Sequence, residues 1–264
     1  MKIDDFRHMR HGKTIQPLSK EQAHWLKPYD KQDLSSEHAL LMLHGFSSSP
    51  AVYRELLPSL SSIYGTIVCP ALPGHATDIA SFSTVQASEW VHAAESACQE
   101  LISSGKKVDV MGLSLGGLLS CHLANTFSLN HLYLLAPALS LKLNIPLSIG
   151  LAKFLRVLGF KSLRNKAGNI HTARSAEIAY RLLPINTIIE ILTLINEFEF
   201  HPPTCSVDIF LGRYDEVVES GHVAGAFNGL PNANLHWLEN SAHVLPLDGD
   251  IDSILACVKK NATF

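Results

Sequence analysis

The chain contains 264 residues, of which 47% are hydrophobic and 17% are charged, and its formal net charge is −3. This composition permits one large domain or two smaller ones with a sizeable core and excludes an intrinsically disordered chain, and the charge supplies no basic field for nucleic acid. No run of about 18 uncharged apolar residues is present, and residues 1–13 lack the apolar segment of a secretory signal. We therefore expect no membrane-spanning helix and no leader.

The cysteines lie far apart in the sequence, and none forms a C-x-x-C pair: Cys69, Cys98, Cys121, Cys205 and Cys257. An odd number of dispersed cysteines favours reduced, packing thiols in a cytoplasmic protein. The same spacing argues against a disulfide framework and against a zinc site.

Strands and helices alternate in the first half of the chain. Residues 1–37 are polar and show only a possible strand or turn near 16–19, so we expect them to lie over the domain. Apolar strands are then predicted over 38–46, 65–70, 107–111 and 131–136, and helices over 51–59, 88–103 and 115–126. Near-continuous apolar strands that alternate with helices indicate a parallel sheet covered on both faces. Functional groups should then gather beyond the carboxyl ends of the strands.

The alternation stops between residues 139 and 200, where short helices are predicted over 147–158, 173–183 and 187–198. About sixty residues is long for one connection, so we expect a helical cap above the sheet edge. Ordinary crossover helices on the flank of the sheet are the alternative. The sheet resumes with strands over 206–212 and 233–238 and helices over 220–227 and 250–260. The predicted core is thus residues 1–138 and 201–264, with the cap at 139–200.

A turn in the middle of the chain holds the most informative motif. The strand over 107–111 leads into Gly112-Leu113-Ser114-Leu115-Gly116, and a largely apolar helix follows. The pattern G-x-S-x-G lets a strand and a helix approach closely, so that a strained serine stands above the sheet edge. This context favours Ser114 as a nucleophile over a glycine-bearing turn that arises by chance.

A serine hydroxyl is a weak nucleophile at neutral pH and needs a neighbouring base. The chain has 14 histidines, so their number decides nothing. His243 follows the last strand by a short loop, whereas His236 lies within that strand and His222 lies within the preceding helix. We therefore predict His243 as the base, and a surface loop histidine is the alternative.

The base in turn needs an acid that orients it. Asp215 lies just beyond a strand, whereas Asp208 lies within that strand with a poorly placed side chain. Glu216 is the next candidate. The predicted triad is Ser114, Asp215 and His243.

The anionic oxygen of a tetrahedral intermediate needs two amide donors. One is the Leu115 N–H at the start of a helix, and the other is expected from the loop after the first apolar strand, at Phe46. His44, which with Gly45 ends that strand, and His75 in a later loop are both interpreted as structural groups.

Five motifs resemble the α/β-hydrolase superfamily, and within it the bacterial carboxylesterase and monoacylglycerol lipase group. They are Leu41-Met42-Leu43-His44-Gly45-Phe46, Pro73-Gly74-His75, Gly112-Leu113-Ser114-Leu115-Gly116-Gly117, Gly212-Arg213-Tyr214-Asp215-Glu216-Val217-Val218 and Ser241-Ala242-His243-Val244. Two positions depart from this pattern, since Ala76 and Ala242 stand where such enzymes usually have glycine.

The resemblance implies an α/β-hydrolase fold with a small helical cap. It also implies hydrolysis of short- to medium-chain acyl esters by a serine carboxylester hydrolase, without a metal or organic cofactor. The expected partner is a small-molecule acyl ester.

Two other functions stay open. A thioesterase, an acyltransferase or an esterase of acyl-carrier-protein esters would use the same triad. Basic residues in the cap would suit a carrier protein, although a solvated helical face explains them as well: Lys142, Lys153, Arg156, Lys161, Arg164 and Lys166. A non-catalytic binding protein on this fold is the third possibility.

An apolar stretch in the cap permits transient contact with a lipid interface: Leu151, Phe154, Leu155, Leu158 and Phe160. Packing over the active site explains this stretch equally well.

Overall fold

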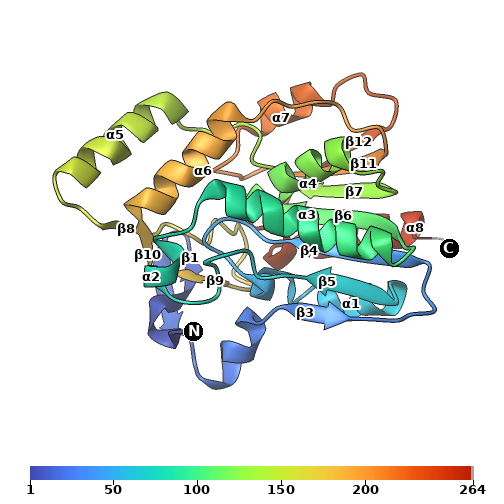
Figure 1. Cartoon of the computed structure of the whole chain (residues 1–264), viewed down its shortest axis with the longest axis horizontal. Helices are drawn as coiled ribbons and strands as arrows, with labels where there is room; N and C mark the ends of the chain where they lie inside the picture. Colours follow the sequence, from blue (N-terminus) through green and yellow to red (C-terminus); the bar gives the residue numbers. More distant parts are fainter. Residues whose placement is uncertain (263–264) are drawn as a thin grey trace.

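The computed structural model describes residues 1–262, and its centre is a seven-stranded sheet with the order β12-β11-β7-β6-β4-β5-β3 (Figure 1). The strands are β3 (Tyr29–Lys31), β4 (His38–Leu43), β5 (Thr66–Cys69), β6 (Lys107–Leu113), β7 (His131–Leu135), β11 (Ser206–Gly212) and β12 (Ala233–Leu238). Neighbouring strands run parallel except for β3, which is antiparallel to β5 at the edge. The predicted mostly parallel sheet is confirmed.

Helices cover both faces of the sheet. The helices α3 (Ala87–Ser103), α4 (Leu115–Thr126) and α7 (Ser220–Ala226) pack on one face, and α1 (Leu57–Ile63) and α8 (Ile251–Asn261) pack on the other. Alternate residues of β4 supply the two cores, because Leu41 faces the first layer and Leu40 faces the second.

The helix predicted over 51–59 is replaced by two shorter elements. A 3₁₀ turn spans Pro50–Tyr53, and α1 begins at Leu57 with Pro58 in its first turn. Proline has no N–H to continue a preceding helix, but its fixed φ suits a helix start. The chain therefore begins a new helix here.

The segment 139–200 is only partly helical. It contains α5 (Ile145–Val157), β8 (Ser162–Arg164), β9 (Glu177–Tyr180), β10 (Leu182–Pro184) and α6 (Ile185–Glu197). The predicted helices over 147–158 and 187–198 are confirmed, but the helix over 173–183 is wrong. Pro184 favours extended backbone before it, and β10 pairs with β8.

The N-terminal segment pairs with the strand β9 of the 139–200 segment. The hairpin of β1 (Phe6–Arg10) and β2 (Lys13–Pro17) forms a three-stranded antiparallel sheet of order β2-β1-β9. The rings of Phe6 and Tyr180 stack with centroids 4.4 Å apart, and Phe6 is fully buried. The first residues of the chain therefore lie over the domain as expected.

The remaining short elements are 3₁₀ turns at Ile3–Asp5, Glu21–Leu26 and Leu245–Leu247 and the one-turn helix α2 (Ile79–Phe82). Among the described residues, every helix is too short or too polar to cross a membrane.

Candidate active site

Ser114 occupies a strained turn between β6 and α4. Its φ of 55° and ψ of −111° lie outside the regions that most side chains adopt. The Ser114 N–H donates to the Leu135 carbonyl and the Ser114 carbonyl accepts from the Ala138 N–H, both at 3.0 Å. A side chain at Gly116 would overlap the Leu43 carbonyl. The close approach of α4 to β4 thus explains the second glycine of the motif.

Asp215 and His243 form a buried acid–base pair. The His243 Nδ1–H donates to Asp215 Oδ2 at 2.8 Å, and the two residues are 9% and 2% exposed. The other oxygen, Oδ1, accepts the N–H groups of Val217 at 2.7 Å and Val218 at 2.9 Å. These amides fix the carboxylate and leave Nε2 of His243 as the basic nitrogen.

Asn169, from the segment between α5 and α6, joins the loops of the acid and the base. Its carbonyl accepts the N–H groups of His243 at 3.0 Å and Val244 at 3.1 Å. Its side-chain Oδ1 accepts the Glu216 N–H at 2.9 Å. One residue therefore sets the spacing between the two loops.

Asp248 holds the histidine loop from the other side. This carboxylate is fully buried and accepts the N–H groups of Ala242 at 2.8 Å, His171 at 2.6 Å and Thr172 at 2.8 Å. The sequence analysis found neither Asn169 nor Asp248, because their oxygens accept backbone N–H groups from segments that are distant in the sequence.

Electrostatics favour a charged His243 and an ionised Asp215. Burial lowers the pKa of His243, but the charge and hydrogen bond of Asp215, with the charge of Glu177, raise it above its ordinary value. Burial likewise raises the pKa of Asp215, but His243 and the two backbone amides bring it below its ordinary value. Glu177 is buried, and burial raises its pKa.

The loop after β4 lies beside Ser114. A side-chain carbon placed on Gly45 would lie 3.4 Å from Ser114 Cβ, which places the loop that precedes Phe46 beside the serine. The His75 Nε2 accepts the Ser47 N–H at 3.2 Å. This bond fixes the loop in its turn, where Ser47 has a φ of 60°.

His44 and His75 are buried neutral imidazoles. The His44 Nε2 accepts the Leu72 N–H at 3.0 Å, and burial lowers the pKa of His44 to about 4. Burial also lowers the pKa of His75, whose Nδ1 contacts the Pro73 carbonyl at 3.2 Å. These contacts agree with the structural interpretation of both residues.

The remaining candidates from the sequence lie apart from this pair. Glu216 is exposed, and His222 on α7 is exposed with Ser140 Oγ 3.4 Å from its Nδ1. Asp208 and His236 contact each other within the strands β11 and β12, before the carboxyl ends of these strands. Ser114, Asp215 and His243 all follow the carboxyl ends of parallel strands, at the edge where sequence reasoning placed them.

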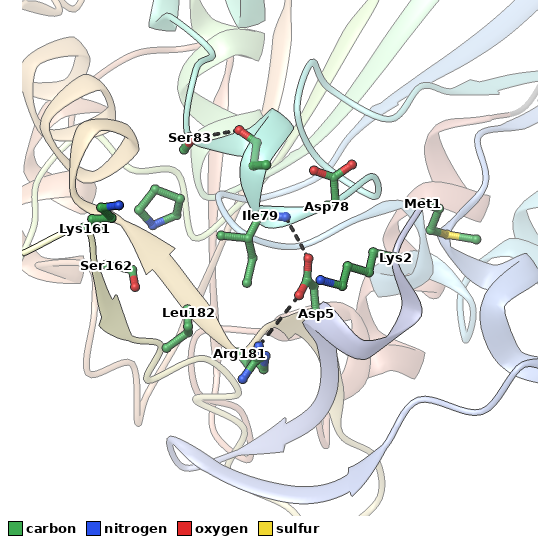
Figure 2. Close-up of a pocket in the computed structure, with 12 residues that line it drawn as sticks. Met1, Lys2, Asp5, Asp78, Ile79, Ser83, Lys161, Ser162, Arg181 and Leu182 are labelled. Atoms are coloured by element: carbon green, nitrogen blue, oxygen red, sulfur yellow. Dashed lines mark hydrogen bonds and ion pairs between the residues drawn. The ribbon is translucent and has the colours of Figure 1, made fainter.

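A cavity of about 570 Å³ lies elsewhere, between the N-terminal residues, α2 and the strands β8 and β10. Figure 2 shows Asp5 within it, bound to the Ile79 N–H at 2.9 Å and 3.9 Å from a guanidinium nitrogen of Arg181. None of the predicted catalytic residues lines this cavity. It is therefore separate from the candidate active site.

Comparison with known proteins agrees with this architecture. Residues 40–251 match the alpha/beta hydrolase family. The thermostable monoacylglycerol lipase of Bacillus sp. (strain H-257) is 25% identical over 227 residues, which cover 82% of this chain and 86% of that protein. The carboxylesterase of Bacillus subtilis (strain 168) is 24% identical over 226 residues, which cover 83% and 89%.

A solved structure from work on the metagenome-derived lipolytic enzymes LipS and LipT is 26% identical in sequence. It has a TM-score of 0.78 and covers 90% of this chain and 97% of its own. The family match spans most of the chain, and the sheet, the strained serine turn and the ordered loops agree with it. The chain therefore belongs to the alpha/beta hydrolase family and is a hydrolase.

Proposed function

We propose that this hydrolase is a serine carboxylester hydrolase that uses Ser114 as nucleophile, His243 as base and Asp215 as the orienting acid. The observation that supports this most strongly is the buried Asp215–His243 hydrogen bond at the strand edge that also presents Ser114. Orientation of the imidazole by a fixed carboxylate is what a serine nucleophile requires.

In the proposed cycle, His243 Nε2 takes the Ser114 hydroxyl proton as Oγ attacks the ester carbonyl. The amides of Phe46 and Leu115 hold the oxyanion, with support from the N-terminus of α4. The tetrahedral intermediate collapses when His243 protonates the leaving alcohol, and an acyl-serine forms. Water activated by His243 then attacks the acyl group and releases the acid and free Ser114.

The proposed substrates are short- to medium-chain acyl esters, including monoacylglycerols. The names of the two Bacillus relatives support this class. We assign the segment 139–200 as a cap domain above the core of residues 1–138 and 201–264. Asn169, which contacts both catalytic loops, links this segment to the site. A cytoplasmic location remains a prediction.

Transient contact with a lipid interface belongs to the same proposal. One face of α5 presents large apolar side chains to solvent: Leu147, Leu151, Phe154, Val157 and Leu158. An adjacent face of α5 packs on α6 through Ala152 and Leu155. Because these side chains are exposed, packing over the active site does not account for them, and a lipid surface would cover them.

A carrier-protein substrate is the second candidate. Lys153, Arg156, Lys161 and Arg164 are exposed on the cap and would suit an acidic partner. Lys142 is different, because its Nζ donates to the Asp215 carbonyl at 2.6 Å and so supports the acid loop.

The proposal is tested with p-nitrophenyl esters and monoacylglycerols of increasing chain length beside acyl thioesters on a carrier protein. We expect the highest kcat/KM on free esters. Ser114→Ala should lower ester turnover by ~10⁴-fold or more, with circular dichroism and thermal unfolding unchanged. Ser140→Ala, at a half-buried serine outside the triad, is the matched control. Full turnover by Ser114→Ala would refute the mechanism, and higher activity on the carrier-bound substrate would favour the second candidate.

A further inference from the structure

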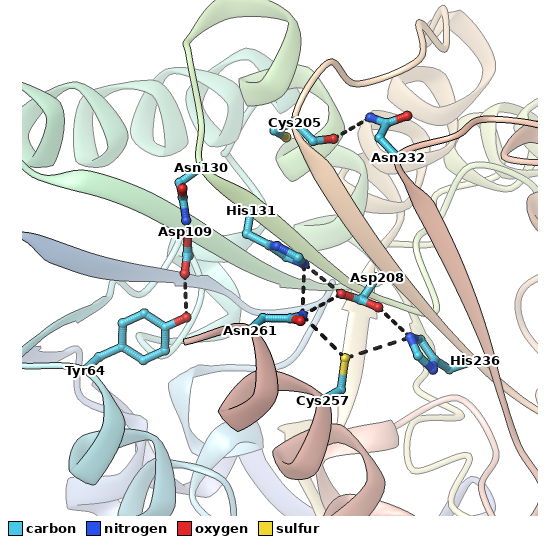
Figure 3. Close-up of polar contacts among 10 residues, drawn as sticks. All are labelled: Tyr64, Asp109, Asn130, His131, Cys205, Asp208, Asn232, His236, Cys257 and Asn261. Atoms are coloured by element: carbon cyan, nitrogen blue, oxygen red, sulfur yellow. Dashed lines mark hydrogen bonds and ion pairs between the residues drawn. The ribbon is translucent and has the colours of Figure 1, made fainter. Parts of the chain in front are cut away.

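Two residues rejected as catalytic candidates meet in a separate polar cluster, together with three others (Figure 3). Asp208 comes from β11, His131 from β7 and His236 from β12, while Cys257 and Asn261 come from α8. His131 opens β7, and Asp208 is the third residue of β11. The cluster therefore lies toward the amino ends of the strands, away from the edge that holds Ser114.

Asp208 is the centre of the cluster and is only 2% exposed. One oxygen, Oδ1, lies 2.6 Å from His236 Nε2. The other oxygen, Oδ2, lies 2.7 Å from His131 Nε2 and accepts the Asn261 side-chain N–H at 2.7 Å. The Cys257 Sγ lies 3.8 Å from His236 Nε2 and 3.6 Å from Asn261 Nδ2. The Cys257 thiol therefore lies beside the two residues, His236 and Asn261, that contact the Asp208 carboxylate.

We propose that Asp208 Oδ1, His236 Nε2 and Cys257 Sγ form a Zn²⁺ site, with His131 and Asn261 as the groups that hold Asp208 Oδ2. The three donor atoms lie within 4.8 Å of one another. Carboxylate, imidazole and thiolate are the three side-chain donors that zinc uses in proteins. A ligating carboxylate whose second oxygen is hydrogen-bonded is a common feature of such sites.

The donors need little movement to bind the ion. Zinc–ligand distances of ~2.0–2.3 Å place tetrahedral donors roughly 3.3–3.6 Å apart. The 3.8 Å separation of Cys257 Sγ and His236 Nε2 is close to this range. The 2.6 Å contact of Asp208 Oδ1 with His236 Nε2 must open by less than about 1 Å when the ion replaces the shared proton.

The surroundings hold these donors in orientation. The His236 ring stacks on Phe210 with centroids 4.7 Å apart, and the His131 ring stacks on Tyr133 at 4.5 Å. Cys257 lies one helical turn before Asn261, which places both on the same face of α8. Two strands of the sheet, β11 and β12, and the helix α8 that packs on the sheet therefore hold the three donors in place.

The cluster opens to solvent through a cavity of about 600 Å³ lined by Asp208, His236 and Cys257. The cavity provides a path for the ion and room for a water molecule as the fourth ligand. Burial and the Asp208 charge raise the pKa of the Cys257 thiol to about 12. Zinc binds the Cys257 sulfur as a thiolate, so binding displaces the thiol proton. This thiolate and the Asp208 carboxylate are two negative ligands that balance the charge of Zn²⁺.

The proposed site departs from the expectation that the spacing of the cysteines argues against zinc. The ligands come from positions 208, 236 and 257, in two strands and a helix, so no short spacing reveals them. Pairing of β11 with β12 and packing of α8 bring them together.

The test uses the full chain, freed of metal by a chelator, and titrates it with Co²⁺ and then Zn²⁺. We expect one equivalent of Co²⁺ to produce a thiolate-to-cobalt charge-transfer band in the near ultraviolet, which one equivalent of Zn²⁺ abolishes. Cys257→Ser should lose the band, whereas Cys205→Ser, at another half-buried cysteine, should keep it. His243→Gln should also keep it, which excludes binding at the catalytic histidine.

Thermal unfolding supplies a second readout. One equivalent of Zn²⁺ should raise the Tm of the native chain and of Cys205→Ser, but not that of His236→Gln, a variant that keeps a polar side chain beside Asp208. The proposal is overturned if Co²⁺ binding does not saturate at one equivalent. A full charge-transfer band in Cys257→Ser would overturn it as well.

Discussion

The protonation of His243 depends on two carboxylates, Asp215 by a direct hydrogen bond and Glu177 at longer range. Both raise the pKa of His243 above its ordinary 6.5. The neutral imidazole is the active base, so kcat/KM should be low at acidic pH and rise to a plateau through an apparent pKa above that value. A pH profile on a soluble p-nitrophenyl ester measures it.

Glu177 offers a direct test of this electrostatic account. Removal of its negative charge in Glu177→Gln should lower the His243 pKa and move the acidic limb of the profile to lower pH. In the native chain the Gly168 N–H donates to Glu177 Oε2 at 2.8 Å, and the side-chain oxygen of glutamine can accept the same bond. Glu216→Gln removes an exposed carboxylate nearby and should leave the limb in place. An identical profile for the native chain and Glu177→Gln would contradict the account.

Variants at Asp215 and at its neighbour Glu216 test which carboxylate orients His243. Asparagine at position 215 would present an amide N–H to His243 and favour the wrong tautomer, so Asp215→Asn should lower kcat by ~10⁴-fold. Glu216→Gln should stay close to the native value. Comparable losses in both variants, measured as kcat at saturating ester, would argue against Asp215 as the orienting acid.

The sequence predicts residues at strand ends better than the groups that support them. Ser114, Asp215 and His243 follow recognisable strands, so the topology of a parallel sheet brings them to one edge. Asn169 and Asp248 contact backbone groups 47 and 77 positions away in the chain, and Glu177 acts on His243 through its charge. No local sequence pattern records these interactions.

The N-terminal hairpin pairs with β9 of the 139–200 segment. Phe6 is fully buried against Tyr180 of β9, and Tyr180 Oη donates to the Gly74 carbonyl at 2.7 Å. Phe6→Ala should therefore reduce the free energy of unfolding by ~3–5 kcal/mol, as measured by urea denaturation. Ile15→Ala, at an exposed position on β2, should change it little. Equal stabilities for the two variants would show that the hairpin does not hold β9.

Periodicity predicts elements whose own residues define a buried face, such as α3, α6 and the parallel strands. It fails for β9, whose four residues are all buried because β1, more than 160 positions earlier, covers them. A short apolar segment without its partner looks the same as part of a buried helix. The wrong helix over 173–183 follows from this ambiguity.

At the scale of the whole molecule, α5 is the most exposed apolar surface of the cap. Phe154 is 58% exposed and Val157 is 83% exposed, on a helix at the end of the molecule away from α8 (Figure 1). The double variant Phe154→Ser/Val157→Ser should reduce co-sedimentation with lipid vesicles and turnover of dispersed medium-chain monoacylglycerol.

The same double variant should hydrolyse a soluble short-chain ester at the native rate, because neither side chain belongs to the catalytic site. Unchanged vesicle binding would contradict a lipid-facing role for α5. A parallel loss on the short-chain ester would instead indicate damage to the cap. The sequence shows that this stretch is apolar, but its exposure follows only from the packing of α5 on α6 through an adjacent face.

The central claim is that Ser114 is the nucleophile of this hydrolase. Its most direct test is labelling with a fluorophosphonate, in which the serine oxygen attacks phosphorus and expels fluoride, followed by mass spectrometry of the digested chain. We expect one adduct per chain on the peptide that contains Ser114. Labelling should abolish ester turnover, and Ser114→Ala should take no label. An adduct on another residue, or full ester hydrolysis by a chain that takes no label, would contradict it.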